Sequence, residues 1–469
     1  MFIMPEKKRI YLCLAHMSEA GLEQKYIKEA FDTNWVVPLG PNVNAFEEEL
    51  EKFSLTPRSN LFACQSKNPS PMGEGSDYLS KKRVVALSSG TAAVHLALIA
   101  CGVGRGDEVI VQSFTFCASS HPITYLGATP VFVDSERETW NMDPELLEVA
   151  IQDRIAKTGR KPKAIVPVAL YGMPYQIDRI MEIANRYEIP VIEDAAEGFG
   201  SRFNGQVLGT FGRYGVLSFN GNKMITTSGG GALITPDEES WREIMMYATQ
   251  YRESYPYYQH EKIGYNYRMS NICAGIGRGQ MTVANDHIEH HKHVQKMYEE
   301  LLADVPGVHV HSQPNNGDYD SNYWLCTITV DEDVKVKGQE DAYKTIVTGA
   351  VGGAAGVIHA AESAHTDCEP NANVEALRVA LDKAQIEARP VWKPMHKQPV
   401  YCRTRENGEL KIENLPCGAV CQTSATSVAY VNGVSEAIFK VGMCLPAGPY
   451  VSDDDVRYIV DTIKASIIG

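Results

Sequence analysis

Residues 84–101 read VVALSSGTAAVHLALIAC, and this stretch decides the fold of the chain. Val84–Leu87 is a short apolar run, typical of a buried strand, and residues 92–101 form an apolar run long enough for a helix. Between them, Ser88-Ser89-Gly90-Thr91 has the small residues of a tight connection. The stretch therefore predicts a strand, a sharp turn and a helix in direct succession.

The same alternation continues toward the C-terminus. Short runs rich in Val and Ile are separated by helical patterns, which indicates a mainly parallel sheet between helices. In such sheets, ligands bind at the carboxyl ends of the strands. The further strands are predicted at 108–111, 130–133, 163–168 and 190–194, and the further helices at 144–156 and 178–187.

Toward the N-terminus the pattern is less regular. We predict a short strand at 9–13, helices at 21–31 and 44–53, and a loop at 34–41 that contains Pro and Gly. Residues 54–82 are polar and rich in Pro and Gly, and we predict that they form a mobile surface loop.

Composition excludes several classes of protein. The chain has 469 residues and a net charge of -14, and it contains no long run of Lys and Arg, so we expect no nucleic-acid partner. Its most apolar stretch, 84–103, contains Ser, Thr and His, so we expect no membrane span. The 11 cysteines are scattered and no signal peptide is evident, which favours reduced thiols in a cytoplasmic protein. Cys417 and Cys421 lack a matching second pair, so no metal site is predicted.

Ser89, Gly90 and Thr91 lie where the first strand of the alternation ends and its helix begins. The free N–H groups and the dipole of a helix N-terminus favour an anion there, most naturally a phosphate. The same residues would also suit a tight turn with a Ser or Thr cap.

Two further candidates follow strands of the same sheet. Asp194 ends the strand at 190–194, where its carboxylate would either cap a helix or pair with a buried cation such as a pyridinium nitrogen. Phe116 follows the strand at 108–111, where its ring would either stack on a flat ligand or belong to the core.

Lys223 lies in the stretch SFNGNKMITTSGGG, residues 218–231. Glycines and Asn allow sharp bends on both sides of this lysine, so its amine can point into a pocket. Lysine amines in pockets form Schiff bases with carbonyl compounds, including pyridoxal phosphate. Read alone, however, Lys223 would be a solvated loop residue.

Taken together, these features describe one ligand. A phosphate anchor, a ring-stacking aromatic side chain, a buried aspartate and a lysine occur in this order along an α/β domain, and pyridoxal phosphate needs all four. A Rossmann dinucleotide site is disfavoured, because no Gly-x-Gly-x-x-Gly follows a strand.

The chain resembles the nucleotide-sugar aminotransferases of the DegT/StrS type. The resemblance covers about residues 10–280, apart from 54–82, and resumes from about residue 386. The stretches that carry it are FDTNW (31–35) with PLGPNV (38–43), SGTAAVHLAL (89–98), DEVIV (107–111), EDAAE (193–197), SFNGNK (218–223), GYNYRMS (264–270) and RPVWKPMH (389–396).

The resemblance implies the aspartate-aminotransferase fold, fold type I. This is an α/β fold with a mainly parallel seven-stranded sheet between helices and a smaller α+β C-terminal domain. We expect residues 1–35 to pack with the small domain, 36–285 to form the large cofactor-binding domain and 286–469 to form the small one. Two stretches of this chain depart from the family pattern, residues 54–82 and residues 331–385. Within the second, Thr348–Ala361 is especially rich in Ala and Gly.

For the cofactor, the resemblance implies a Schiff base between pyridoxal 5'-phosphate and Lys223. Asp194 would pair with the pyridine nitrogen and Phe116 would stack on the ring. Glu197, where the family often has Gln or His, would lie near the ring hydroxyl. The phosphate would be bound by Gly90, Thr91 and Ser218.

The resemblance also implies roles for residues that would contact the cofactor from a second subunit or contact the sugar. Asn266 would reach the phosphate from a neighbouring subunit, so the resemblance implies a homodimer with shared sites. Trp392 and His396 would lie near the sugar.

The implied reaction is transamination of a nucleotide-linked keto sugar, with L-glutamate as the amino donor. A branch of the family with histidine in place of the lysine removes a sugar hydroxyl instead, and Lys223 places this chain with the aminotransferases. Its motifs are most similar to members that act at C4 of a UDP-linked 4-keto-6-deoxy-N-acetylhexosamine for bacterial surface polysaccharides or glycans. The alternatives are a keto sugar aminated at C3, a dTDP-linked sugar, and a non-catalytic sugar-nucleotide-binding or regulatory protein.

Overall fold

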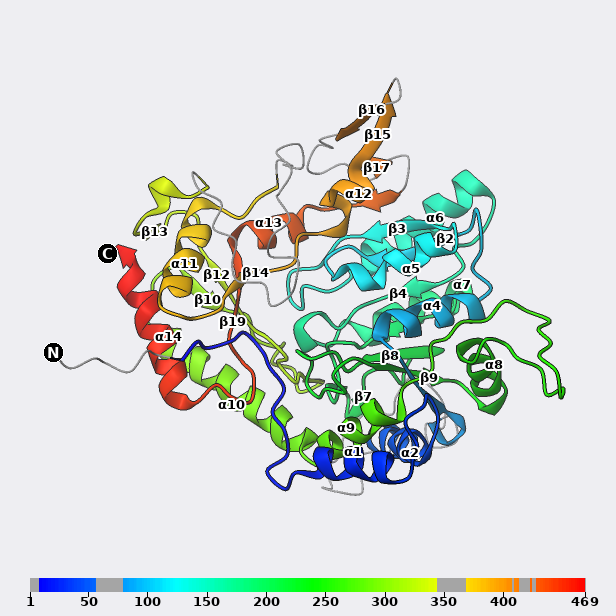
Figure 1. The fold of residues 1–469 in the computed structure, drawn as a ribbon. Coiled ribbons are helices and arrows are strands. Elements are labelled where there is room, and N and C mark those ends of the chain that lie inside the picture. Colours follow the sequence, from blue (N-terminus) through cyan, green and yellow to red (C-terminus); the bar gives the residue numbers. More distant parts are fainter. Residues whose placement is uncertain are drawn as a thin grey trace.

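The structure, a computed structural model, describes residues 8–55, 79–343, 368–406, 409–412, 422–423 and 427–468. Figure 1 shows a larger part built on a wide sheet and a smaller part beside it. The predicted loop at 54–82 and the Ala/Gly-rich stretch Thr348–Ala361 fall mostly or wholly outside the described residues. Among the described residues, no helix is both long enough and apolar enough to span a membrane.

The wide sheet contains the strands that were predicted from the alternation of short apolar runs and helical patterns. β9 runs antiparallel to both of its neighbours, whereas all neighbouring strands from β8 to β3 are parallel. Isolated parallel bridges, Ile165 with Val191 and Val168 with Asp194, connect β4 to β5. The predicted mainly parallel α/β sheet is therefore confirmed. Its strand order is β1 (Arg83–Leu87), β9 (Gly231–Thr235), β8 (Tyr214–Ser218), β5 (Ile192–Asp194), β4 (Ile165–Val166), β2 (Glu108–Gln112) and β3 (Thr129–Val133).

The C-terminal part of the chain extends this sheet. β18 (Val428–Tyr430) pairs parallel with β3, and β17 (Gln422–Thr423) pairs antiparallel with β18. A segment from the range expected to form the small domain thus contributes strands to the large sheet.

Helices cover both faces of the sheet, which explains why its strands are apolar on both sides. Along β1, Val84 and Ala86 belong to one buried cluster, while Val85 and Leu87 belong to another. The first cluster includes residues of α2 (Pro41–Leu55), α6 (Pro144–Thr158), α7 (Ile177–Tyr187) and α9 (Asn271–Met281). The second includes residues of α4 (Gly90–Ala100), α5 (His121–Tyr125) and α8 (Glu238–Ala248).

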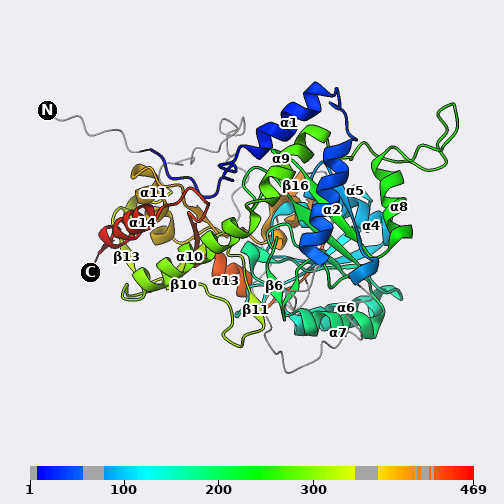
Figure 2. The same ribbon diagram turned by 90° about the horizontal axis from the view of Figure 1, so that it is seen from below.

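The smaller part is built on an antiparallel sheet with its own buried cluster. Figure 2 shows its helices grouped to one side of the larger part. Its sheet order is β10 (Val308–Val310), β12 (Cys326–Val330), β19 (Gly442–Leu445) and β14 (Arg389–Pro390). Its helices include α10 (Ala284–Leu302), which leads out of the larger part, α11 (Ala372–Lys383), α13 (Val434–Val441) and α14 (Asp453–Ser466).

Short elements complete the described chain. The 3-10 helices are Cys117–Ser119, Leu170–Gly172, Gln339–Asp341 and Met395–Lys397, and a short α-helix spans Pro399–Cys402. The remaining strands are β6 (Arg202–Phe203), β7 (Gln206–Val207), β11 (Tyr319–Asp320), β13 (Lys335–Val336), β15 (Arg403–Glu406), β16 (Glu409–Ile412) and β20 (Ile467–Ile468).

The N-terminal segment contacts both parts. Ile10 makes a single parallel bridge to Ile386, and Ala447 donates a backbone hydrogen bond to the carbonyl of Leu12. The strand predicted at 9–13 is therefore wrong: the segment has one bridging residue, because it crosses the small part without running along a neighbouring strand. α1 (Leu22–Asp32) packs on α9, where a Cβ at Gly279 would lie 2.7 Å from the Glu23 nitrogen. Only glycine permits this close approach of the two helices.

Candidate active site

A cavity of about 330 Å³ lies at the carboxyl ends of β1, β5 and β8, as expected for a parallel sheet. Most of the residues predicted for the site line it together, although they come from widely separated stretches. These residues are Gly90, Thr91, Phe116, Asp194, Glu197, Ser218, Lys223 and Trp392.

The turn after β1 forms one end of the cavity. Ser89 is extended and its Oγ accepts a hydrogen bond from the Ala92 nitrogen at 3.0 Å, so the predicted N-cap of α4 is present. The first N–H groups of a helix have no acceptor within that helix, so those of Gly90 and Thr91 are suited to an anion. The cradle is tight: a Cβ at Gly231 would lie 2.4 Å from the Gly90 nitrogen, and one at Gly90 would lie 3.0 Å from the Ser218 Cβ.

Asp194 also lines the cavity, at the end of β5. Its Oδ2 accepts a hydrogen bond from the Ser119 hydroxyl at 2.6 Å, and its Oδ1 accepts one from the Ala196 nitrogen at 3.1 Å. Burial raises the pKa of Asp194, with these two hydrogen bonds and the charge of Lys223 opposing that effect. A buried carboxylate held in this way would gain from a cationic N–H donor in the cavity.

Lys223 contacts an acidic and an aromatic side chain. Its Nζ is 3.4 Å from Glu197 Oε1, and it lies 3.9 Å from the ring centroid of Trp324. Glu197 Oε2 accepts a hydrogen bond from the Tyr171 nitrogen at 2.7 Å. Burial raises the pKa of Glu197, and the nearby charge of Lys223 is the largest opposing influence. The solvated loop position considered for Lys223 is thereby excluded, since its side chain is only 13% exposed.

Phe116 and Trp392 form an aromatic pair at the mouth of the cavity, with ring centroids 5.9 Å apart. Phe116 is 53% exposed, so it is not a core residue. Both rings also line a second, more open hollow of about 380 Å³, together with His121, Lys393 and Gln398. The two hollows share a wall, so a ligand with two distinct halves could occupy both.

Two of the predicted residues do not line the cavity. His396 is buried, its Nδ1 lies 2.6 Å from the Ser113 hydroxyl, and burial lowers its pKa to about 4. Asn266 is exposed and makes an antiparallel bridge to Thr249 outside the cavity. Because Asn266 does not line the described chain's own cavity, it could act only on another molecule or after a movement of its segment.

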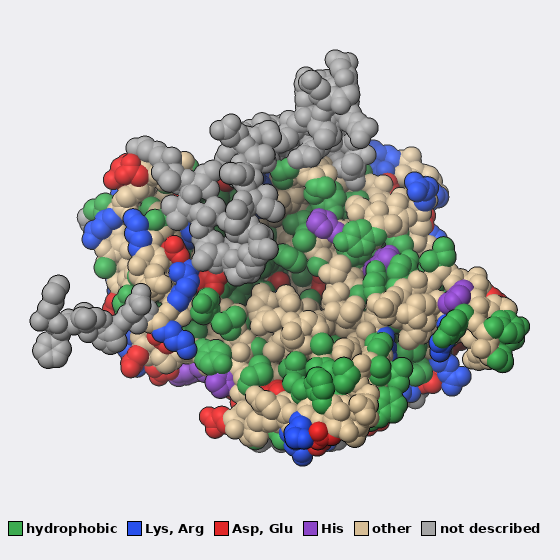
Figure 3. All heavy atoms as spheres, viewed as in Figure 1, with side chains coloured by type: hydrophobic (Ala, Val, Ile, Leu, Met, Phe, Trp, Pro, Cys, Tyr) green, Lys and Arg blue, Asp and Glu red, His purple; other side chains and the backbone are tan. Residues whose placement is uncertain are grey.

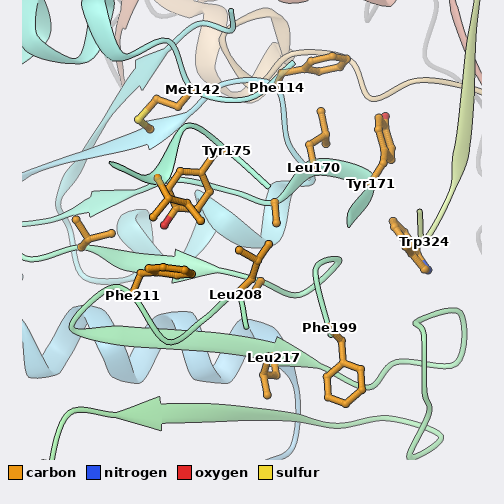
Figure 4. Packing of buried hydrophobic residues seen from close by; sticks show 14 of the residues in the cluster. Phe114, Met142, Leu170, Tyr171, Tyr175, Phe199, Leu208, Phe211, Leu217 and Trp324 are labelled. Carbon is orange, nitrogen blue, oxygen red and sulfur yellow. The ribbon is translucent and has the colours of Figure 1, made fainter. Parts of the chain in front are cut away.

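Sequence reasoning missed Ser119, Tyr171 and Trp324. Figure 4 shows Tyr171 and Trp324 along the same edge of the packed core. Tyr171 acts through its backbone nitrogen, and Ser119 lies in a short 3-10 helix, so neither has a side-chain motif that marks it. Trp324 lies just before β12 in the small part, and its sequence neighbours resemble the start of an ordinary strand.

The donor set fits pyridoxal phosphate in chemical terms. The tight cradle with free N–H groups suits a phosphate, the buried Asp194 suits a protonated ring nitrogen, and Lys223 can reach an aldehyde. No group of three or more metal-ligating side chains occurs among the residues that the structure describes.

Comparisons with known proteins point the same way. The model of the DegT/DnrJ/EryC1/StrS aminotransferase family matches residues 73–354. The chain is 37% identical over 456 residues to a Bacillus subtilis protein named "Putative pyridoxal phosphate-dependent aminotransferase EpsN", covering 97% of this chain and 95% of that one. It is 32% identical to the GDP-perosamine synthase of Escherichia coli O157:H7, covering 97% and 98% of the two chains. The crystal structure of a DegT DnrJ EryC1 StrS aminotransferase from Brucella abortus is similar to it, with a TM-score of 0.71, 25% identity and 95% of each chain covered.

Proposed function

We propose, starting from the fact that this chain belongs to the DegT/DnrJ/EryC1/StrS aminotransferase family, that it aminates C4 of a UDP-linked 4-keto-6-deoxy-N-acetylhexosamine. The enzyme is a pyridoxal-phosphate-dependent nucleotide-sugar aminotransferase, and its amino donor is proposed to be L-glutamate. The single observation that carries this function is the convergence of Lys223, Asp194 and the Gly90–Thr91 cradle on one cavity. Its product would serve the synthesis of bacterial surface polysaccharides or glycans.

Each residue has a proposed task in this reaction. When bound, the cofactor supplies an electron sink for the carbon that loses its proton. Lys223 holds the cofactor and, once its amine is free, moves the proton at the reacting carbon. Asp194 keeps the ring nitrogen protonated, and Glu197 faces the amine of Lys223 at 3.4 Å. Gly90, Thr91 and Ser218 bind the phosphate.

The outer hollow supports a substrate with a sugar half and a nucleotide half. Phe116 is proposed to stack on the cofactor ring, and Trp392 lies beside it where a sugar would enter. The indole nitrogen of Trp392 is buried and has no hydrogen-bond partner among the described residues, so a turn of the ring toward the hollow would offer its N–H to a sugar oxygen. The predicted sugar contact of His396 would require that residue to leave its bond with Ser113.

A GDP-linked keto sugar is the second candidate, because a protein named GDP-perosamine synthase matches nearly the whole chain. A panel of acceptors tests the choice: UDP-linked 4-keto, UDP-linked 3-keto, dTDP-linked 4-keto and GDP-linked 4-keto sugars, each with L-glutamate. We expect the UDP-linked 4-keto-6-deoxy-N-acetylhexosamine to give the highest kcat/KM, by about tenfold or more over the others. A higher value for the GDP-linked sugar would replace the UDP assignment and leave the aminotransferase assignment intact.

We also propose a homodimer with shared sites. The segment between α1 and α2 exposes several large apolar side chains, and so does the loop between α8 and α9. Figure 3 shows hydrophobic side chains gathered on the projecting loop and near the lower edge of this face. A second copy of the chain would cover them and bring its Asn266 to the phosphate. These side chains are Phe31 in the last turn of α1, Trp35, Val36, Val37 and Leu39 in the first segment, and Tyr255, Tyr257, Tyr258 and Ile263 in the second.

Complementation between Asn266→Ala and Lys223→Ala, assayed at a cofactor concentration too low to load the Asn266→Ala dimer, tests the shared site. Asn266→Ala is expected to weaken cofactor binding by about 10- to 100-fold, because a hydrogen bond to a charged group is lost. In a mixed dimer of Asn266→Ala and Lys223→Ala, one site carries both changes and the other carries neither. Unfolding and refolding the two variants together should therefore restore about a quarter of the wild-type activity. No recovery in mixed dimers, or an active species with the 51.8 kDa mass of one chain, would contradict the shared site.

A further inference from the structure

Tyr171 contacts two residues of the site that lie far apart in the sequence. Its backbone nitrogen donates a hydrogen bond to Glu197 Oε2, and its hydroxyl accepts one from the backbone nitrogen of Trp392, each at 2.7 Å. Glu197 faces Lys223 inside the cavity, whereas Trp392 lines both hollows. Tyr171 therefore links the carboxylate beside Lys223 to the aromatic wall at the mouth.

The backbone conformation of Tyr171 produces this arrangement. Its φ of 54° lies in the left-handed region, which tyrosine seldom adopts, and Gly172 follows with a φ of 94°. A Cβ at Gly172 would lie 1.8 Å from Asn322 Oδ1, so only glycine fits there. A residue in a rarely populated conformation persists only where its surroundings determine it. The turn thus directs the N–H of Tyr171 to Glu197 and its phenol to Trp392.

The phenol has aromatic neighbours and a protonated hydroxyl. Its ring centroid lies 5.6 Å from that of Trp392 and 6.5 Å from that of Phe114, which is fully buried. Burial raises the pKa of Tyr171 well above its ordinary value, so the hydroxyl keeps its proton. A neutral hydroxyl can accept from Trp392 and donate at the same time, and the Cys444 thiol of β19 lies within hydrogen-bond reach as the acceptor.

The segment that follows β14 is held at two points. At one end, the nitrogen of Trp392 donates to the Tyr171 hydroxyl. At the other, the nitrogen of Met395 donates to the Ser113 carbonyl at 2.8 Å, and that of His396 donates to the Ser113 Oγ at 3.2 Å. The indole nitrogen of Trp392 has no hydrogen-bond partner among the described residues, so the polar restraint on its end of the segment comes from Tyr171.

We propose that Tyr171 is a positioning residue whose hydroxyl fixes Trp392 where the acceptor sugar contacts it, while its backbone nitrogen fixes Glu197 beside Lys223. The two tasks use different atoms of one residue, so removal of the hydroxyl alone should impair only the binding of the sugar. This inference rests on the proposed function, in which the sugar enters beside Trp392.

Tyr171→Phe tests this proposal, because it removes the hydroxyl and keeps the ring and the backbone nitrogen. In the full-length enzyme loaded with pyridoxal phosphate, the rate at which L-glutamate converts the visible band should stay within about twofold of the wild type, since Glu197 keeps its backbone bond. The KM of the best acceptor in the panel should rise about 3- to 10-fold with little change in kcat, because a binding surface loses one hydrogen bond that fixes it.

Tyr175→Phe is the matched control. It removes the hydroxyl of another buried tyrosine, one that lines neither hollow and makes no hydrogen bond to Trp392. Both kinetic constants should stay at their wild-type values.

A double variant separates positioning from a general loosening of the fold. Trp392→Ala alone should raise the KM of the acceptor, and addition of Tyr171→Phe should raise it no further, because no indole remains to be positioned. Independent, additive effects of the two changes on KM would contradict the positioning role.

Hydrogen exchange gives a readout that uses no sugar. The Trp392 amide donates to a buried hydroxyl, so it should exchange slowly in the wild type although its segment is irregular, and faster in Tyr171→Phe. An unchanged KM in folded Tyr171→Phe, or an equal slowing of the glutamate step, would overturn the proposal. If that variant does not fold, rapid exchange of the Trp392 amide in the wild type overturns it as well. Failure of the proposed function looks different, because the wild-type enzyme would then convert no acceptor of the panel.

Discussion

Lys223→Ala is expected to abolish transamination, with a loss of about 10⁴-fold or more in kcat. The variant loses both the group that attaches the cofactor and the base that moves the proton. No neighbouring amine can take over within the described site, because Lys223 is the one lysine among the residues that line the cavity. The measurement is turnover with the best acceptor of the panel, together with the visible absorption band after addition of pyridoxal phosphate.

The fold should survive this change. The carboxylate of Glu197 loses its cation but keeps its bond to the Tyr171 nitrogen, and the indole of Trp324 keeps its bond to Asn222. Circular dichroism and Tm should therefore stay close to those of the wild type. Turnover within tenfold of the wild type, in a variant that lacks the visible band, would refute the role of Lys223.

Asp194→Asn should lower kcat/KM by about 10² to 10³-fold, which at 1.36 kcal/mol per tenfold corresponds to ~3–4 kcal/mol, within the range lost when one partner of a buried ion pair is removed. An amide cannot keep the ring nitrogen protonated, so cofactor affinity and catalysis should fall together. We would measure the Kd of pyridoxal phosphate by titration of its absorption, and kcat/KM at saturating cofactor.

The pKa of Asp194 gives this variant a second expected property. Burial raises that pKa in the folded protein, so ionisation of Asp194 lowers stability as the pH rises through the folded-state pKa. At neutral pH, the cofactor-free Asp194→Asn protein should therefore be at least as stable as the cofactor-free wild type. Weaker cofactor binding combined with an undiminished Tm would separate a functional effect from unfolding.

Glu193→Gln is the matched control, because Glu193 precedes Asp194 in β5 and points to the opposite face. Its carboxylate accepts hydrogen bonds from the nitrogens of Gly209, Phe211 and Gly212, at 2.6–3.0 Å, and does not line the cavity. The change should lower the free energy of unfolding by about 1–3 kcal/mol and leave the cofactor spectrum unchanged. Equal effects of both variants on cofactor affinity would contradict the assigned role of Asp194.

Much of the site could be predicted because its residues belong to local patterns. The strand–turn–helix signal at 84–101 predicted β1, α4 and the Gly90–Thr91 cradle, and Asp194 stands at a strand end as expected. Strand ends meet at one edge of a parallel sheet, so a one-dimensional pattern was sufficient to bring these residues together.

The remaining features depend on contacts between distant parts of the chain. Trp324 packs in the buried cluster of the large part and contacts Lys223 from about a hundred positions further along the chain, and no local spacing reports that packing. β18 pairs with β3 of the large sheet although the elements of the small part separate the two strands in the sequence. The strand predicted at 9–13 was wrong because an apolar run that crosses a domain looks the same in sequence as one that pairs along it.

The absorption spectrum of the purified protein with pyridoxal phosphate, before and after addition of L-glutamate, tests the central claim most directly. We expect a visible band that depends on Lys223 and that converts to a band near the ultraviolet as the cofactor takes up the amino group. A protein that shows no visible band, even with excess pyridoxal phosphate, would contradict the assignment of this cavity as the active site of an aminotransferase.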